Sequence, residues 1–255
     1  MPSTYMVNDH RQSQLHQIQG DFSVQNARNR SLPHHQEIPV LANFNHLQKL
    51  GPRTFDLWTQ IMSHPALRDS KLWMLKFPGE AEPHLKREMH NKGVAEDRLL
   101  LTDKFASAEH LSVKRAASIL LDTLEYNAHV SGLDALWVGL PLLTLAGSNM
   151  ARRCGASFLR TSKIPELLAR TEEEYVAIGQ RLASAGMHKG SKLRELRERV
   201  EKQRLEGELF DTFRWVKHLE RLLGVMWEVA AASEGQGPMN IALSGYQGWA
   251  AQAHS

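Results

Sequence analysis

Residues 118–145, SILLDTLEYNAHVSGLDALWVGLPLLTL, place a short apolar run, a polar loop, a helical stretch and a second apolar run in succession. Similar short runs occur at 38–44 (IPVLANF), 71–77 (KLWMLKF) and 98–102 (RLLLT), and stretches of helical periodicity occur at 54–62 and 82–93. This alternation predicts β-α-β units, because parallel neighbouring strands need a crossover that a helix supplies. We therefore expect an α/β fold with a Rossmann-like parallel sheet and flanking helices.

The pattern changes at both ends of this region. After Gly147 the strand pattern fades, and three helices are predicted at 171–185, 189–204 and 209–231, as a C-terminal helical tail. Residues 1–37 are rich in Gln, Asn, His, Arg and Ser and predict an irregular segment. The expected organisation is therefore an irregular segment at 1–37, a lobe with its helical tail at 38–231, and a flexible tail at 232–255.

Composition limits the function classes. The chain has 255 residues, of which 42% are hydrophobic and 23% charged, as in soluble globular proteins. Its net charge of +3 is too small to indicate a nucleic-acid partner. The longest apolar runs, such as 140–146, are far shorter than the ~20 residues of a membrane span, so no membrane partner is expected. The one cysteine, Cys154, excludes an intramolecular disulfide and favours a reducing compartment.

The loop at 124–132 is the first candidate site. In open α/β sheets, ligands bind beyond the carboxyl ends of the strands, where loops lead into helices. Ser131 and Gly132 are expected to leave backbone N–H groups free in the first turn of a helix, which attracts phosphate. His129 can add a hydrogen bond to a phosphate or sugar oxygen. The alternative is an ordinary serine N-cap beside a loop histidine.

Two further loops carry polar residues after predicted strands. In the loop at 43–49, Lys49 could neutralise the charge that builds on a departing diphosphate. The alternative is a solvated surface lysine. The loop at 107–110 ends in His110, for which the alternative is a histidine at the start of a helix or on the surface.

Six segments together resemble one family. They are NFNHLQK (43–49), LWMLKFPGEAEP (72–83), AEH (108–110), LDTLEYNAHVSGLDALWVGLPLLTL (121–145), ERLLGVMWE (220–228) and MPSTYMVNDHRQ (1–12). The four segments between 43 and 145 occur in the order found in protein O-GlcNAc transferases and in their SPINDLY-type plant relatives, which transfer fucose. The chain therefore resembles the C-terminal part of the catalytic region of this glycosyltransferase family.

The resemblance implies a two-lobed glycosyltransferase fold, with the donor held mainly by the C-terminal lobe. It implies transfer of N-acetylglucosamine from UDP-GlcNAc to Ser or Thr of nuclear and cytosolic proteins, with no metal and no cofactor. GDP-fucose is the alternative donor. The resemblance implies that an N-terminal catalytic lobe and a tetratricopeptide repeat region are missing from this chain. Residues 1–12 resemble the end of that lobe. A truncated, non-catalytic binding module is therefore a second alternative.

The resemblance also assigns roles to residues near Lys49. Lys49 matches the family lysine that contacts the donor diphosphate and assists the leaving group, which makes it the candidate catalytic residue. His46 stands where the O-GlcNAc enzymes usually have glutamine, beside the diphosphate. His110 matches a histidine beside the uracil. Ser107 replaces a lysine that helps to hold the nucleotide.

The remaining assignments lie on the 124–132 loop and the helix after it. His129, Val130 and Ser131 match the loop that binds phosphate and sugar, with Val130 and Ser131 in place of a threonine pair. Gly132 follows in the same turn, and Asp134 matches an acidic residue near the ribose. All of these are expected donor-binding residues.

The last predicted helix carries an apolar stripe. Its members are Phe210, Phe213, Val216, Leu219, Leu222, Leu223 and Met226, with Trp215 and Trp227 beside them. In two-lobed transferases the last helix commonly packs across the lobe junction, and without a partner lobe part of the stripe would face water. The alternative is that the whole stripe packs on its own lobe.

Overall fold

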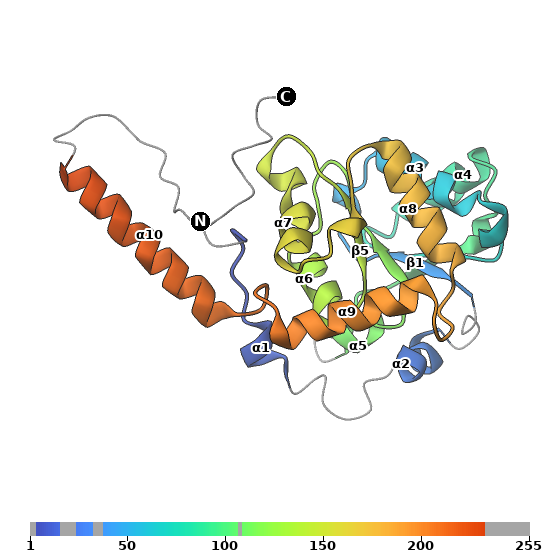
Figure 1. Ribbon diagram of the computed structural model, residues 1–255. Coiled ribbons are helices and arrows are strands. Elements are labelled where there is room, and N and C mark those ends of the chain that lie inside the picture. Colours follow the sequence, from blue (N-terminus) through green and yellow to red (C-terminus); the bar gives the residue numbers. More distant parts are fainter. Residues whose placement is uncertain (1–3, 16–23, 33–37, 107–108, 233–255) are drawn as a thin grey trace.

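A computed structural model describes residues 4–15, 24–32, 38–106 and 109–232 (Figure 1). Its sheet has six parallel strands in the order β3-β2-β1-β4-β5-β6. The strands are β1 (Val40–Asn43), β2 (Lys71–Leu75), β3 (Leu99–Thr102), β4 (Ile119–Leu121), β5 (Leu142–Leu145) and β6 (Leu168–Ala169). This is the doubly wound order, and the direction of winding reverses between β1 and β4. The predicted Rossmann-like parallel sheet is confirmed.

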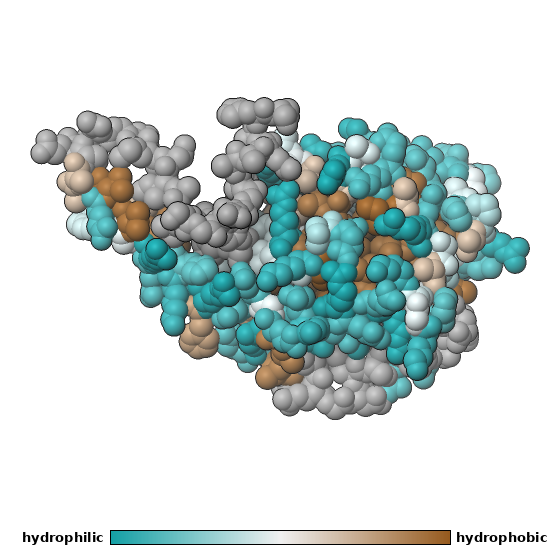
Figure 2. Space-filling model, in the orientation of Figure 1, coloured by the Kyte–Doolittle hydropathy of each residue, from teal (hydrophilic) through white to brown (hydrophobic). Residues whose placement is uncertain are grey.

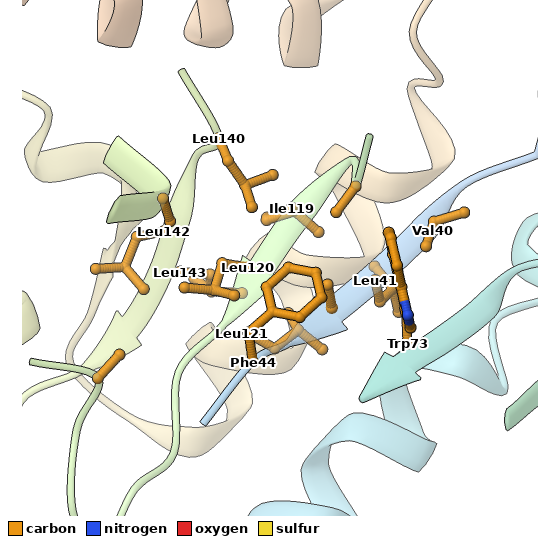
Figure 3. Packing of buried hydrophobic residues seen from close by; sticks show 14 of the residues in the cluster. Val40, Leu41, Phe44, Trp73, Ile119, Leu120, Leu121, Leu140, Leu142 and Leu143 are labelled. Atoms are coloured by element: carbon orange, nitrogen blue, oxygen red, sulfur yellow. The ribbon is translucent and has the colours of Figure 1, made fainter. Parts of the chain in front are cut away.

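The central strands are buried on both faces. All four residues of β1 and all three of β4 are buried, which explains why their sequences read as continuous apolar runs instead of alternating ones. Ala42 of β1 pairs with Trp73 of β2 on one side and with Leu120 of β4 on the other. Figure 3 shows Trp73 and Leu120 among the side chains packed around the middle of the sheet. The core therefore fixes the strand ends around which the site is built.

Helices cover both faces of the sheet (Figure 1). The remaining elements of the lobe are α3 (Pro52–Met62), α4 (Ala81–Asn91), α5 (His110–Lys114), α6 (Val130–Trp137), α7 (Cys154–Thr161), α8 (Glu172–Ser184) and α9 (Lys192–Glu206). Helix α3 packs on α8, and α6 packs on α5 and α9. Thr171 and Ser191 cap α8 and α9 by accepting hydrogen bonds from Glu174 and Arg194 N–H groups. The predicted C-terminal helices are confirmed.

Within residues 1–37, the described segments contain more regular structure than the sequence indicates. The described part includes α1 (His10–Ser13) and α2 (Val24–Ser31). Neither helix has an apolar period, and both are held by contacts with the lobe. The Arg28 guanidinium donates to the Ala116 carbonyl at 2.9 Å and to the Ser118 hydroxyl at 2.7 Å. The Asn8 amide donates to the Leu209 carbonyl at 2.8 Å.

The last helix, α10 (Thr212–Ala232), extends away from the lobe (Figure 1). Its apolar residues form a brown patch in Figure 2. Phe213 is 76% exposed and Trp227 77%, and Leu222 is the one residue of the helix that is buried. The apolar stripe therefore does not pack entirely on its own lobe, because most of it faces water. Within the described residues, no helix combines the length and the apolar character needed to span a membrane.

Candidate functional site

A cavity of about 450 Å³ opens where the winding of the sheet reverses. The loops that follow β1 and β4 supply most of its walls, and the N-terminal segment adds one residue. The lining consists of Met6, Phe44, Asn45, His46, Lys49, Tyr126, His129, Val130 and Ser131. This position, outside the carboxyl ends of neighbouring strands at the reversal, is where open α/β sheets bind ligands. The volume is within the range of small-molecule sites.

Lys49 is fixed against the loop that follows β4. It ends the 3₁₀ turn η2 (Leu47–Lys49), and its Nζ donates to the Asn127 carbonyl at 3.0 Å. The same Nζ lies 4.0 Å from the centre of the Tyr126 ring, in a cation–π contact. Burial lowers the pKa of Lys49, while the charges of Asp122 and Cys154 act in the opposite direction. The structure therefore places Lys49 in the cavity and not on a solvated surface.

His129 lies beside the same aromatic ring. The His129 and Tyr126 rings are 4.6 Å apart between centroids, with 30° between their planes. Burial lowers the pKa of His129, and the positive charge of Lys49 lowers it further. Its Nε2 is buried and has no hydrogen-bond partner within the described part of the chain. Because Nδ1 donates to the Ala151 carbonyl, Nε2 of the neutral imidazole is an acceptor, which suits a ligand hydroxyl.

The start of α6 lies one residue earlier than the sequence indicates. The helix begins at Val130, and the Gly132 amide already donates to the His129 carbonyl at 3.0 Å. The prediction of a free Gly132 N–H is therefore wrong, and the first-turn amides that the helix leaves without an acceptor belong to Val130 and Ser131. Gly132 contributes through its size, because a Cβ there would lie 3.3 Å from the Ala128 Cβ.

A polar network joins the two loops beneath the cavity. The Ser131 hydroxyl donates to the Asn45 side-chain oxygen, so Ser131 does not act as an N-cap. The Asn45 amide reaches the Thr123 hydroxyl at 3.4 Å, and the Asn43 amide donates to the Leu121 carbonyl at 2.7 Å. These bonds tie the ends of β1 and β4 together and hold the first turn of α6 in the cavity wall.

Asp134 and His110 come together away from Lys49. The Asp134 carboxylate accepts from His10 Nε2 at 2.9 Å, pairs with Lys114, and lies 3.6 Å from His110 Nε2. Burial alone would raise the pKa of Asp134. Hydrogen bonds from His10 and His110 and the charge of Lys114 outweigh it and hold the pKa well below its usual range. None of these four residues lines the cavity, although Asp134 follows Val130 by one helical turn.

His46 and Ser107 are the remaining predicted donor-binding residues. His46 lines the cavity, and its ring contacts Phe77 edge-on at 4.5 Å between centroids. Its Nδ1 accepts from the Gln48 amide at 3.3 Å. Ser107 lies outside the described residues, so its role stays a prediction from the family resemblance.

A second depression, of about 340 Å³, lies between α8 and α9. Its lining is Glu166, Arg181, Leu182, Lys192 and Leu196. These residues come from helices and from a 3₁₀ turn, and none follows the carboxyl end of a strand at the reversal. The cavity around Lys49 is therefore the better candidate for a site that carries chemistry.

Sequence reasoning missed four residues of the lining. Asn45 and Tyr126 stand in the loops that were singled out, and their place next to Lys49 and His129 was the available signal. Phe44 continues an apolar run and reads as core. Met6 had no signal, because no pattern links it to a loop more than a hundred residues away.

Three known proteins are similar to this chain. The chain is 32% identical over 234 residues to the UDP-N-acetylglucosamine–peptide N-acetylglucosaminyltransferase of Caenorhabditis elegans, which covers 83% of this chain and 20% of the worm protein. It is 32% identical over 242 residues to the probable enzyme of the same name, SEC, of Arabidopsis thaliana, covering 94% of this chain and 24% of the plant protein. The solved structure of a mutant of the Thermobaculum terrenum O-GlcNAc transferase superposes with a TM-score of 0.70 at 32% identity, covering 77% of this chain and 37% of that one.

The chain thus spans about a fifth to a quarter of the length of these curated relatives. The sequence model of glycosyl transferase family 41 matches residues 2–219, which include every strand of the sheet and every residue of the cavity lining. The chain belongs to glycosyl transferase family 41.

Proposed function

We propose that the cavity binds the diphosphate and sugar of UDP-GlcNAc, and that the protein to which this lobe belongs transfers GlcNAc to Ser or Thr of acceptor proteins. The observation that carries the proposal is that three suitable groups lie together in one cavity. Lys49, the unpartnered His129 Nε2 and the first turn of α6 meet in one cavity at the reversal of the sheet. A cation and a helix N-terminus suit a diphosphate, and the imidazole acceptor suits a hydroxyl of the sugar.

In the proposed reaction, an acceptor hydroxyl attacks the anomeric carbon while the bond from that carbon to the β-phosphate oxygen breaks. UDP leaves with the electron pair, and the hydroxyl proton passes to a general base that we do not assign to this chain. Lys49 and the α6 terminus stabilise the negative charge on the departing diphosphate, and attack from the opposite side inverts the configuration. Fixed charges and dipoles replace a metal in this scheme.

The donor assignment follows the relatives. The names of the Caenorhabditis and Arabidopsis proteins specify UDP-N-acetylglucosamine. GDP-fucose shares the diphosphate, so Lys49 and the α6 terminus suit either donor. The base and the sugar distinguish the two, and the family resemblance places His110 and Ser107 near the base. We place the reaction in the cytoplasm or nucleus, because the single cysteine is a free buried thiol.

Calorimetric titration of the 255-residue chain tests the donor site. We expect UDP to bind more tightly than GDP. The Lys49→Ala chain should show no UDP binding above the background heat. Lys202→Ala removes the same charge from an exposed position on α9 and should bind UDP as the wild type does. A folded chain that binds neither nucleotide would favour the non-catalytic reading.

Transfer itself needs a longer protein that carries both lobes. There, radiolabelled GlcNAc from UDP-GlcNAc should appear on Ser or Thr of an acceptor protein, and Lys49→Ala should remove it. Unchanged transfer by the Lys49→Ala protein would contradict the assigned role of Lys49.

A further inference from the structure

The loop between β4 and α6 is closed around one buried carboxylate. Asp122 follows β4 directly and is 1% exposed. Its Oδ1 accepts hydrogen bonds from the N–H groups of Thr123, at 2.9 Å, and Ala128, at 2.6 Å. A single oxygen therefore holds the first residue of the loop and the residue before His129, and it closes residues 123–128 into a ring.

The second carboxylate oxygen is held from the far side. Asp122 Oδ2 accepts from the Thr144 hydroxyl of β5 at 2.6 Å. Helix α7 passes directly over both groups, because a Cβ added at Gly155 would lie 2.7 Å from Asp122 Oδ2 and 2.5 Å from Thr144 Oγ1. The missing side chain at Gly155 thus leaves the space that the carboxylate occupies.

The closed loop presents the groups that hold Lys49. The Asn127 carbonyl accepts from Lys49 Nζ at 3.0 Å, and the Tyr126 ring lies 4.0 Å from the same atom. Inside the ring, the Asn127 side-chain amide donates to the Thr123 carbonyl at 2.7 Å, and the Thr123 hydroxyl donates to the Tyr126 carbonyl at 2.6 Å. Both the hydrogen bond and the cation–π contact of Lys49 Nζ are therefore made with this loop.

We propose that Asp122 is a positioning residue for the donor site: its Oδ1 closes the 123–128 loop and so sets the position of Lys49. The proposal rests on the proposed function, since it assigns Asp122 a part in binding the same diphosphate. Asp122 touches no ligand in this scheme and acts through Asn127 and Tyr126.

The titratable groups around the carboxyl come from several elements. Lys49 lies after β1, Cys154 begins α7, and Tyr175 of α8 donates its hydroxyl to the Asp122 carbonyl at 3.0 Å. Burial raises the pKa of the Asp122 carboxyl to about 7. Hydrogen bonds from Thr144, Ala128 and Thr123 and the charge of Lys49 act against this rise. The carboxyl therefore titrates in a range that is accessible to measurement.

Calorimetry on the full chain measures the UDP affinity of each variant. A set of matched variants then distinguishes a positioning role of Asp122 from a general effect on folding. Asp122→Ala removes Oδ1 and should weaken UDP binding about tenfold or more, the cost of losing the two hydrogen bonds that close the loop. Asp122→Asn keeps an acceptor at Oδ1 and should restore the affinity to within about threefold of the wild type. Thr144→Val, which removes only the Oδ2 partner, should also stay within about threefold.

Gly155→Ala gives an independent test from another element. The added Cβ would lie 2.5 Å from Thr144 Oγ1 and 2.7 Å from Asp122 Oδ2, so these groups must move. We expect the substitution to weaken UDP binding as Asp122→Ala does, because its Cβ displaces the carboxylate. Circular dichroism and thermal unfolding confirm that each variant is folded before titration.

The amide signals of the wild-type chain test the loop closure without any variant. In a pH series followed by NMR, the Thr123 and Ala128 amide protons should shift together with one midpoint near pH 7, the pKa of Asp122. The Asn127 amide, which donates to the Ala151 carbonyl, should not follow them. Different midpoints for Thr123 and Ala128, or titration of one without the other, would overturn the closure.

The failures can be told apart. A folded wild-type chain that does not bind UDP contradicts the proposed function itself. A wild type that binds UDP, with a folded Asp122→Ala chain that binds it equally well, contradicts only the positioning role. Loss of binding in Asp122→Asn as large as in Asp122→Ala would also overturn it, because Oδ1 geometry would then not be what matters.

Discussion

Lys49 is held by a carbonyl oxygen and an aromatic ring, neither of which carries a formal charge. The ammonium group therefore keeps its positive charge available for an anion, and burial lowers its pKa. An incoming diphosphate would meet a partly desolvated cation, for which a hydrogen bond contributes more than at an exposed lysine. The pKa shift gives this arrangement a pH dependence that can be measured.

We predict that UDP affinity falls as the pH rises through the lowered pKa of Lys49. The neutral amine binds the diphosphate less well, so the loss should begin at a lower pH than for an ordinary exposed lysine. Lys49→Arg keeps its charge over this range and should show a flatter alkaline limb. Calorimetric titration between pH 7 and 10 measures both, and identical alkaline limbs would contradict the assignment.

Asp122 gives a stability prediction of opposite sign to that of a paired surface carboxylate. Burial raises its pKa from 3.8 to about 7, so between these values the folded state keeps a proton that the unfolded chain has lost. The stability from this group is full below about pH 4 and is lost as the pH rises towards 7. Asp122→Asn removes the effect. Relative to the wild type, the variant should gain a few kcal/mol in free energy of unfolding from pH 4 to pH 8. Urea unfolding at both pH values measures the gain, and a constant difference would contradict the shift.

For single residues, the sequence indicated which charged and titratable groups belong to the site, but not the exact positions of backbone groups. Lys49 and His129 were candidates from their place after predicted strands and received donor-site roles from the family resemblance, and the structure puts both in the cavity. The free amide assigned to Gly132 was wrong, because a one-residue shift in the helix start changes which N–H groups lack an acceptor. Met6 was missed because tertiary packing alone brings it to the cavity.

Among the secondary-structure elements, the long and strongly patterned ones were predictable. The apolar runs became β1 to β5, and the periodic stretches became α3, α4, α8, α9 and α10. Strand β6 and helix α7 were not predicted. Two residues are too few to show a period, and α7 begins with Cys154 and Gly155, which favour no helix. Helix α7 nevertheless covers Asp122, so the sequence pattern missed a helix on which the site depends.

The exposure of α10 leads to a prediction about two tryptophans. Trp137 of α6 is fully buried, and Trp137→Ala should lower the free energy of unfolding by about 3–5 kcal/mol. Trp227 of α10 is 77% exposed. Trp227→Ala should change the free energy of unfolding by less than about 0.5 kcal/mol. Chemical denaturation of both variants measures the difference, and a large loss in Trp227→Ala would mean that α10 packs on the lobe.

For the whole molecule, the strand order could not be derived from the sequence alone. The alternation of strands and helices predicts a parallel sheet, but the runs do not show that β4 pairs with β1 and not with β3. That pairing brings the loops after β1 and β4 to one place, although 78 residues separate Lys49 from Asn127. The site therefore depends on the reversal of the sheet, which local sequence patterns do not show.

A lobe that binds the diphosphate through Lys49 and the α6 terminus should do so without a divalent ion. We predict that UDP affinity is the same in EDTA and in millimolar Mg²⁺, because fixed charges already neutralise the phosphates. Calorimetry under both conditions makes the comparison. A strong requirement for the metal would contradict the metal-free scheme.

The most direct measurement is an NMR titration of the isotope-labelled chain with UDP. Binding at the reversal of the sheet predicts that the largest shifts fall on amides of the loops after β1 and β4, from Asn45 to Lys49 and from Tyr126 to Ser131. The same signals should be unaffected by UDP in Lys49→Ala. Shifts gathered instead around Arg181 and Lys192, in the depression between α8 and α9, would contradict the assignment of the donor site.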